Sequence, residues 1–492
     1  MNFNKYLRRI SLFLTLTAVY SQPLMATSLS LTDIPDEIAE ISEVESEEVI
    51  DYTKYITSDK LLLPRNLYIL KGTTAASERL NIFYKNALLT LSPNSNVSSS
   101  SPYGQSLMGR WLFQTLSDST PMSSQPFELT LTARTNYGVT SQSTTVELVD
   151  TSNTNPVRLL AIGDSLTRAG VYLSQVVNSL PNVTTLGTRY YPDDNVPARE
   201  GRGGWTLEKY FSFINSEQLD SPFMFPSSVS GAHYKGNTRD WKAICYTLPN
   251  NAIYKGFQKI ARGWKDEGEF LYDKNGYYKY PEIGDVMVDP SRPYDSQWVE
   301  WNGTVWQPMN VQPTSYEFNF SKYIARYKEA FAEGTPTHVS ILLGANEFGF
   351  NKELDNIDYF IDRLNQMIDS IHTYDPTIKI ILCTPPVAPN TYFVTSVESK
   401  EFYTEYDLRI KYITSKLLEA FDTDEALARQ IYIAPMTLTL DTTNGFNYIQ
   451  KNELVDGTIT QVVDAIYSIH PNNEYGQLQM GTTLAAVIQK YR

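Results

Sequence analysis

The chain has 492 residues, of which 42% are hydrophobic, and a formal net charge of -14 at pH 7. This length exceeds one ordinary domain and predicts two or three, each large enough to bury its own core. The acidic balance argues against a nucleic-acid partner, because neutralising phosphates requires a basic face.

The first residues indicate export. Three basic residues precede an apolar stretch over 10–19, and small residues follow at Ser21 and Ala26. This order is typical of a secretory signal peptide, here residues 1–26, and the apolar stretch is too short to cross a bilayer. We therefore expect a periplasmic or extracellular protein without a transmembrane segment.

Two segments are expected between the signal and the main domain. Within residues 27–56, the stretch 33–51 contains nine acidic residues and no basic one. Such a composition is typical of a solvated linker. Residues 57–150 contain short strand-like segments separated by polar turns, and Phe127, Leu129 and Leu131 alternate with polar residues. This pattern predicts a small all-β sandwich domain.

From residue 157 onward, apolar strand-like segments alternate with amphipathic helical ones. The strand candidates are 157–162, 183–186, 338–343, 379–383 and 430–434. Helices are expected after Ser165, over 357–371, over 401–428 and from Leu478 to the end of the chain. Near-continuous apolar strands that alternate with helices predict an α/β domain, 157–492, in which helices cover both faces of a parallel sheet.

An aromatic-rich stretch at about 212–318 interrupts this alternation and predicts an inserted subdomain or a lid. Trp298, Trp301 and Trp306 are candidates for stacking on sugar rings, and subdomain core is the alternative. His233 is a candidate substrate contact, with an ordinary surface position as its alternative.

Four short motifs lie where sheet strands end or where the last helix begins, which is where open α/β sheets build their sites. They are Gly163–Thr167, Glu200–Thr206, Gly344–Glu347 and Ser468–Asn472. The first places Ser165 at a turn from a buried strand into a helix, a position at which α/β proteins expose a nucleophile.

With these motifs in this order, the chain resembles the SGNH (GDSL) hydrolase family. The resemblance covers about 157–492 outside the insertion and implies a flavodoxin-like parallel sheet and serine-hydrolase chemistry. The family's serine, glycine, asparagine and histidine correspond to Ser165, Gly204, Asn346 and His470. The Gly-Arg-Gly-Gly-Trp-Thr block and the preceding β-sandwich resemble secreted bacterial members that act on carbohydrates.

This chemistry needs those residue types. Ser165 becomes a nucleophile only when a base takes its proton, and a histidine suits that task near neutral pH. The chain has four histidines. His338 is expected in a buried strand, His372 near a helix end and His233 in an irregular loop, so His470 is the expected base. The backbone N–H groups of Ser165 and Gly204 and the side-chain amide of Asn346 are the expected oxyanion donors.

The chain departs from the family pattern beside the histidine and after the asparagine. The aspartate that usually stands three residues before the histidine is replaced by Tyr467. Three alternatives follow: a dyad in which a backbone carbonyl orients the ring, Asp464 as the third catalytic residue, or another carboxylate, Glu453 or Asp456. Glu347 stands where the family usually has aspartate, and we expect it to support the loop.

The expected function is a serine esterase that removes a small acyl group, expected to be acetyl, from a carbohydrate. A lipase, lysophospholipase or thioesterase on the same fold and a carbohydrate-binding protein with a decayed site are the alternatives. The sequence has neither metal-ligand spacing nor a phosphate-binding loop, so no metal or cofactor is expected. Cys245 and Cys383 are either two separate buried thiols or one disulfide.

Overall fold

The computed structural model describes residues 50–71, 79–114, 125–188, 196–212, 221–237, 282–288, 292–350, 354–455, 457–466 and 468–492. Asp51–Arg492 forms one compact unit. The predicted signal peptide and most of the predicted acidic linker lie outside the described residues. The same holds for Cys245, Asp456 and Tyr467.

A parallel sheet forms the centre of this unit. Its strands lie in the order β11 (Val183–Leu186), β10 (Val157–Gly163), β19 (His338–Leu342), β20 (Lys379–Cys383) and β21 (Ile431–Ala434). In chain order this is 2-1-3-4-5, the flavodoxin-like order. A short strand, β12 (Glu200–Gly201), pairs with the carboxyl end of β10. The predicted strand segments are therefore confirmed to within one residue at each end.

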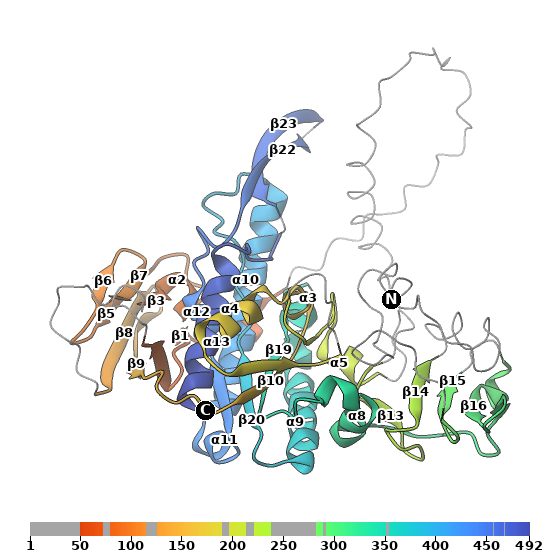
Figure 1. Cartoon of the computed structure of the whole chain (residues 1–492). Coiled ribbons are helices and arrows are strands. Elements are labelled where there is room, and N and C mark those ends of the chain that lie inside the picture. Colours follow the sequence, from red (N-terminus) through yellow and green to blue (C-terminus); the bar gives the residue numbers. More distant parts are fainter. Residues whose placement is uncertain are drawn as a thin grey trace, which may run out of the picture. The chain divides into compact units, whose positions relative to one another are not determined.

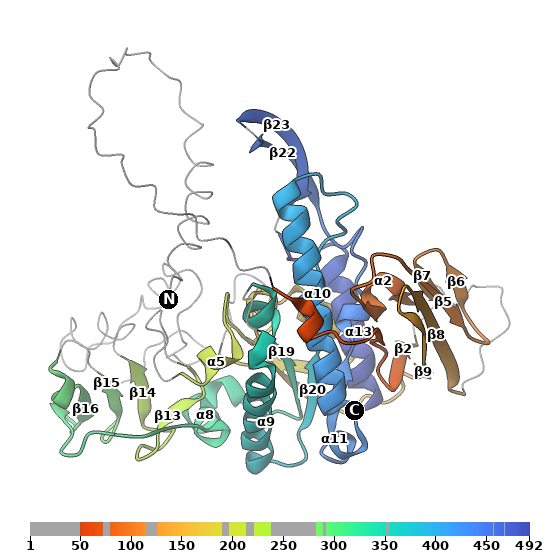
Figure 2. The same ribbon diagram turned by 180° about the vertical axis from the view of Figure 1, so that it is seen from behind.

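Helices cover both faces of the sheet (Figures 1 and 2). The covering helices are α4 (Val171–Ser179) and α13 (Gly476–Lys490) on one face, and α9 (Ile357–Tyr374) and α10 (Val397–Phe421) on the other. Successive residues of a strand point to opposite faces. Leu159 and Ala161 of β10 accordingly share a buried cluster with the first pair of helices, whereas Leu160 and Ile162 share one with the second.

Two predicted helices are each divided in the structure. The segment after Ser165 forms α3 (Ser165–Ala169) and then α4, because Gly170 at φ 70 ends the first helix. The stretch predicted over 401–428 forms α10 and α11 (Asp424–Ala428). Thr423 separates them, since its hydroxyl accepts a hydrogen bond from the Ala426 N–H and caps a new helix. The remaining helical elements are η1 (Tyr52–Lys54), α2 (Tyr84–Ala87), α5 (Leu207–Tyr210), η4 (Tyr294–Ser296), α8 (Phe320–Arg326), η5 (Lys328–Phe331), η6 (Ala345–Gly349), η7 (Leu354–Asn356) and α12 (Met436–Thr439).

The N-terminal part of the unit is built of strands. One sheet contains β2 (Asn66–Leu70), β9 (Gly138–Val149), β8 (Phe127–Thr135) and β5 (Ser95–Ser100), another contains β3 (Arg79–Phe83), β7 (Arg110–Gln114) and β6 (Gln105–Leu107), and β1 (Lys60–Leu61) pairs with β4 (Leu88–Leu89). The predicted alternation holds along β8, where Leu129 and Leu131 are fully buried. Asn86 of α2 donates to the carbonyl oxygens of Thr437 and Leu440, which fixes this part against α12. A β-sandwich as a separate domain stays a prediction.

The described parts of the inserted region contain short strands. β13 (Met224–Pro226) pairs with β18 (Tyr316–Phe318), and a four-stranded sheet contains β14 (Tyr234–Asn237), β15 (Val286–Val288), β16 (Trp298–Trp301) and β17 (Trp306–Pro308). Residues 238–281 and 289–291, within the same region, lie outside the described residues.

An antiparallel hairpin of β22 (Tyr448–Val455) and β23 (Thr458–Ala465) extends away from the sheet in both ribbon views (Figures 1 and 2). This hairpin was not predicted. The sequence did carry the signal, because Asp456-Gly457 between Val455 and Thr458 is the residue pair that favours a two-residue hairpin connection.

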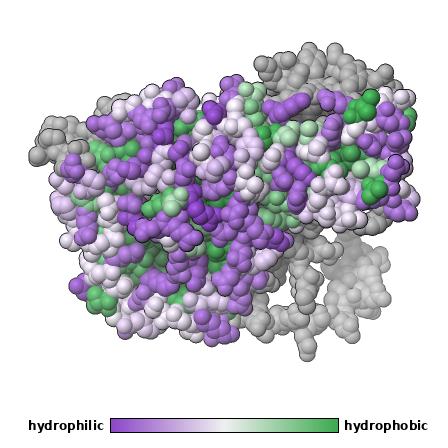
Figure 3. Space-filling model, turned by 90° about the horizontal axis from the view of Figure 1, so that it is seen from below, coloured by the Kyte–Doolittle hydropathy of each residue, from purple (hydrophilic) through white to green (hydrophobic). Residues whose placement is uncertain are grey.

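The surface is mainly hydrophilic on the face shown in Figure 3, where hydrophobic residues gather only in small groups. Of the helices in the described ranges, none is both long enough and apolar enough to span a membrane. Cys383 is a free thiol in the core, and burial raises its pKa.

Candidate active site

Ser165 lies at the carboxyl end of β10, as the first residue of α3. The turn before it needs glycine, because a Cβ on Gly163 would collide with the side chain of Thr167 and the carbonyl oxygen of Leu342. The side chain of Asp164 accepts a hydrogen bond from the Leu166 N–H at 3.0 Å and caps the helix. This local geometry leaves Ser165 half-buried at the edge of the sheet.

His470 is brought to this serine from the other end of the domain. Its Nε2 lies 2.8 Å from Ser165 Oγ, although the two residues are 305 positions apart. The segment that carries His470 is held in place by Asn472, whose side-chain oxygen accepts from the N–H groups of Tyr475 and Gly476 at the start of α13. With its proton on Nδ1, the ring can accept the serine proton at Nε2.

The two other predicted oxyanion donors lie on neighbouring loops. Gly204 has φ 70, in the left-handed region that favours glycine. The Asn346 side-chain amide donates to the carbonyl oxygen of Trp205 at 3.0 Å. An amide nitrogen carries two hydrogens, so one fixes the side chain while the second is available to a developing oxyanion. Asn346 follows β19, which is the neighbour of β10 in the sheet.

A buried network that the sequence did not reveal supports the segment before Gly204. The guanidinium of Arg202 lies 3.3 Å from the carboxylate of Glu200, and both side chains are almost fully buried. Tyr323 donates to the same carboxylate at 2.7 Å. Tyr210 donates to the carbonyl oxygen of Gly163 at 2.8 Å, which joins this segment to the strand end beside Ser165. The network links the predicted nucleophile turn to the predicted oxyanion loop.

Two buried carboxyl groups, those of Asp164 and Glu347, belong to residues next to Ser165 and Asn346 in the chain. Glu347 accepts hydrogen bonds from the N–H of Gly344, at 2.9 Å, and from the N–H of Leu207, so it holds the two loops together. Burial raises the pKa of Glu347 to about 7 against the lowering effect of these bonds. Burial likewise raises the pKa of Asp164 to about 7. Both carboxyl groups therefore lose their protons near pH 7.

Asp464, the candidate third catalytic residue, lies on β23 and is bonded on several sides. Its carboxylate accepts from Ser399 at 2.6 Å and from Tyr403 at 2.9 Å, and it pairs with Lys451 at 2.5 Å. Burial raises the pKa of Asp464, but the bonds from these three groups outweigh burial and lower it overall. These contacts join β23 to α10 and β22 through Asp464. A link between Asp464 and His470 stays a prediction.

The other carboxylates considered for this role are Glu453 and Asp456. Glu453 accepts from the hydroxyl of Ser396 at 3.0 Å and lies 2.7 Å from the ammonium of Lys451. Asp456 and Tyr467 are outside the described residues. The identity of the group that orients His470 therefore stays a prediction.

The aromatic candidates of the inserted region are mostly enclosed. Trp298 is 5% exposed and Trp301 is 7% exposed. Trp298 packs against Tyr234, with ring centroids 6.0 Å apart. This burial favours the core alternative for Trp298 and Trp301, whereas Trp306 on β17 is partly exposed.

His233, the candidate substrate contact, pairs with a carboxylate. Its Nδ1 lies 3.2 Å from Asp285 Oδ1, and its side chain is 42% exposed. This pairing is made within the inserted region, and a contact of His233 with substrate stays a prediction. In the parts of the chain that the structure describes, there is no group of three or more His, Cys, Asp or Glu residues placed to hold a metal ion.

Comparison with known proteins finds no matching family model and no matching curated protein. Among solved structures, a carbohydrate esterase family 3 protein from Talaromyces cellulolyticus is similar, with 14% identity, a TM-score of 0.31, and coverage of 68% of this chain and 98% of that chain. A Clostridium thermocellum family 3 carbohydrate esterase shows 11% identity, a TM-score of 0.28, and coverage of 69% and 98%.

A Corynascus thermopiles (Myceliophthora fergusii) carbohydrate esterase family 2 enzyme with a carbohydrate binding domain shows 13% identity and a TM-score of 0.30. The similarity covers 85% of this chain and 91% of that chain. All three of these structural neighbours are described as carbohydrate esterases.

Proposed function

We propose that the protein is an exported serine esterase that removes small acyl groups, chiefly acetyl, from carbohydrate. The observation that carries the proposal is the 2.8 Å approach of Ser165 Oγ to His470 Nε2 at the carboxyl edge of a parallel sheet. A hydroxyl paired with an imidazole, beside loops with amide donors, is the set of groups that ester cleavage requires.

In the first half of the reaction, Nε2 of His470 takes the proton of Ser165 as Oγ bonds to the ester carbonyl carbon. The carbonyl oxygen becomes an oxyanion, which the N–H groups of Ser165 and Gly204 and the amide of Asn346 stabilise. The bond from carbon to the sugar oxygen then breaks. The sugar oxygen takes the proton from Nε2 and leaves as an alcohol.

In the second half, water attacks the acyl group on Ser165 and gives a proton to His470. The tetrahedral intermediate collapses, Oγ takes the proton back, and the carboxylic acid leaves. Each half uses the same base and the same oxyanion donors, so a single site serves both.

The substrate class and the location are supported by separate features. The order of basic, apolar and small residues over 1–26 supports export. The four motifs, the strand-rich N-terminal part and the aromatic-rich insertion support a carbohydrate substrate, as in the secreted carbohydrate-active members of the SGNH family that the chain resembles. Retention of all four motif residues argues against a decayed site.

The proposal is tested with Ser165→Ala and with a matched control, Ser152→Ala, which replaces an exposed serine in the segment before β10. We expect Ser165→Ala to lower the rate of 4-nitrophenyl acetate hydrolysis by roughly four orders of magnitude, and Ser152→Ala to leave it unchanged. Acetate release from acetylated polysaccharides should follow the same pattern. Equal rates for wild type and Ser165→Ala would refute the nucleophile, and a preference for long-chain esters would favour a lipase.

A further inference from the structure

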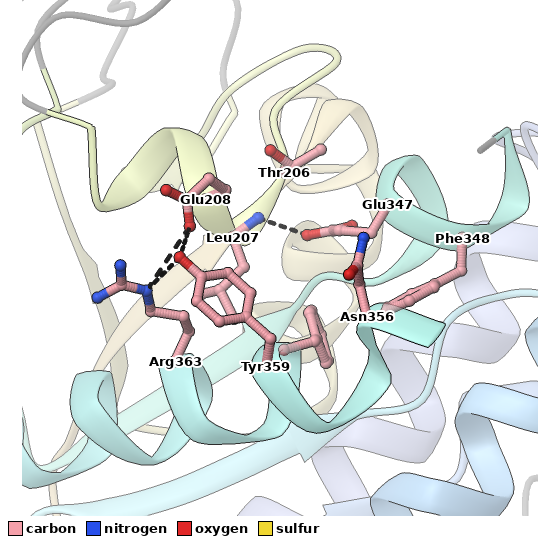
Figure 4. Close-up of a pocket in the computed structure, with 9 residues that line it drawn as sticks. Thr206, Leu207, Glu208, Glu347, Phe348, Asn356, Tyr359 and Arg363 are labelled. Atoms are coloured by element: carbon pink, nitrogen blue, oxygen red, sulfur yellow. Dashed lines mark hydrogen bonds and ion pairs between the residues drawn. The ribbon is translucent and has the colours of Figure 1, made fainter. Parts of the chain in front are cut away.

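A pocket of about 220 Å³ lies between α5, η6 and α9 (Figure 4). Its lining includes the buried side chains of Leu207, Phe348 and Phe360, together with Glu347 and Asn356. Its rim is polar and includes Glu208 and Arg363. The pocket thus combines apolar side chains with hydrogen-bonding ones.

Three rim side chains are held together in a fixed arrangement. Tyr359 OH donates to Glu208 Oε2 at 2.7 Å, and Arg363 Nε donates to Tyr359 OH at 2.8 Å. Figure 4 shows these side chains meeting at one side of the pocket. The guanidinium of Arg363 also lies over the ring of Phe211, 4.8 Å from its centroid, which restricts its movement.

The same three groups remain accessible. Tyr359 is 47% exposed, and the side chains of Glu208 and Arg363 are 52% and 29% exposed. A ligand can therefore reach preorganised donors and acceptors, which lowers the entropic cost of ordering them on binding.

The pocket adjoins the segments that carry the predicted oxyanion donors. Its lining includes Thr206 and Leu207, which follow Gly204 closely in the chain, and Glu347, which follows Asn346 directly. Glu347 accepts from the Leu207 N–H and joins both segments at the pocket wall. A ligand held here lies against the loops that would stabilise the reacting acyl group.

The chemistry of the rim selects the ligand class. Sugar hydroxyls both donate and accept, and the Glu208 carboxylate and the Arg363 guanidinium supply the two complementary functions side by side. The positive charge of Arg363 is balanced by Glu208 at 3.6 Å, so this pair presents no net charge to an anion. A purely apolar chain would displace water from the exposed Glu208 carboxylate without offering it a hydrogen bond, which costs free energy.

We propose that this pocket binds a neutral sugar ring of the glycan, next to the unit that carries the acyl group. The proposal rests on the esterase function above for the identity of the glycan substrate. The exposed ring of Tyr359 supplies a surface for the apolar face of the sugar, and Glu208 and Arg363 bind its hydroxyls.

Binding is tested first without catalysis, on full-length Ser165→Ala protein, by calorimetric titration with xylotetraose, mannotetraose, cellotetraose and tetragalacturonate. We expect at least one neutral tetrasaccharide to bind, and Arg363→Met or Tyr359→Ala to raise its Kd about tenfold or more. The control Asp362→Asn, an exposed position of α9 that does not line the pocket, should leave Kd unchanged. Absence of neutral-sugar binding, a preference for tetragalacturonate, or equal Kd values in all variants would overturn the pocket assignment.

Kinetics on the active enzyme then separate the two proposals. In Arg363→Met and Tyr359→Ala, KM for an acetylated oligosaccharide should rise about tenfold more than KM for 4-nitrophenyl acetate, which has no sugar. Equal losses on both esters would reject the sugar pocket and leave the esterase intact. Sugar binding by the pocket together with undiminished hydrolysis by Ser165→Ala would reject the serine mechanism and leave the pocket intact.

Discussion

The side-chain amide of Asn346 donates to the backbone carbonyl oxygen of Trp205 at 3.0 Å. This bond ties the loop after β19 to the segment that contains Gly204, and so holds two predicted oxyanion donors at a fixed separation. The bond also orients the amide, whose second hydrogen is the one proposed to meet the oxyanion.

Replacing this amide should slow the chemical step. We expect Asn346→Ala to lower kcat for 4-nitrophenyl acetate about 10²- to 10³-fold with little change in KM, because the lost bond forms mainly in the transition state. Steady-state kinetics measure the effect, and a melting curve checks that the variant is folded. A loss of less than about threefold in a folded variant would remove Asn346 from the oxyanion site.

Gly204 should be required for its backbone conformation. It has φ 70, and a Cβ there would meet nothing within 4 Å. The strain in Gly204→Ala would therefore come from the backbone dihedral angle and not from a steric clash. We expect a stability loss of about 1–2 kcal/mol and a clear loss of activity, since the relaxed backbone would turn the N–H away from the oxyanion.

Gly109 offers a matched control for this change. It also has a positive φ, 86, and a Cβ added there would meet nothing within 4 Å, but it lies in the turn between β6 and β7. Gly109→Ala should cost similar stability in urea unfolding and keep full esterase activity. Equal activity in the two variants would contradict the role of Gly204.

The carboxyl of Asp164 should make stability depend on pH. Burial raises its pKa to about 7, whereas an aspartate in the unfolded chain loses its proton near pH 4. Between about pH 4 and pH 7 the folded protein therefore binds more protons at this site than the unfolded chain. Its contribution to the free energy of unfolding is greatest below about pH 4 and falls as the pH rises to about 7.

Asp164→Asn tests this dependence, because asparagine also caps helices well and does not titrate. We expect the free energy of unfolding of the variant, relative to that of wild type, to rise by up to a few kcal/mol as the pH is raised from about 4 to about 7. Urea unfolding across this range measures the difference, with the exposed change Asp362→Asn as the control. Parallel pH curves for wild type and Asp164→Asn would show that this carboxyl does not titrate as described.

Asp464 should act as a brace. Its oxygens are occupied by Ser399, Tyr403 and Lys451. We expect Asp464→Asn to cost about 1–3 kcal/mol of unfolding free energy and no more than about tenfold in kcat. A triad aspartate replaced by asparagine costs about 10⁴ in kcat in the well-studied serine proteases. A loss of that size with unchanged stability would make Asp464 the group that orients His470.

Asn86 should hold the N-terminal strands against the α/β part. Its side-chain nitrogen donates to the carbonyl oxygens of Thr437 and Leu440 at 3.0 and 2.8 Å, and the residue is fully buried. Asn86→Ala leaves two buried acceptors without this partner, and we expect a loss of about 2–4 kcal/mol in unfolding free energy. The exposed change Asn96→Ala on β5 should cost almost nothing, and equal losses in the two variants would count against the docking role.

Much of the α/β part could be predicted from local sequence. The segment 379–383 matches β20 without error, because a strand that is buried on both faces must be apolar. The segment 183–186 also matches β11 without error, although this edge strand buries only Leu186. The helix breaks at Gly170 and Thr423 were missed, since they depend on single residues inside otherwise periodic stretches. The hairpin of β22 and β23 was missed although its Asp-Gly turn was present in the sequence.

Within the site, the sequence alone placed Ser165 at a strand end and predicted His470 as its base, because both inferences use local pattern and residue chemistry. Only the tertiary structure brings the two side chains to 2.8 Å, joins Asn346 to Trp205, and surrounds Asp464 with three side-chain partners. It also buries Trp298 and Trp301 and forms the pocket beside Glu347. Local periodicity encodes which residues are buried, but the partner that a buried or polar side chain meets is set by the packing of segments far apart in the chain.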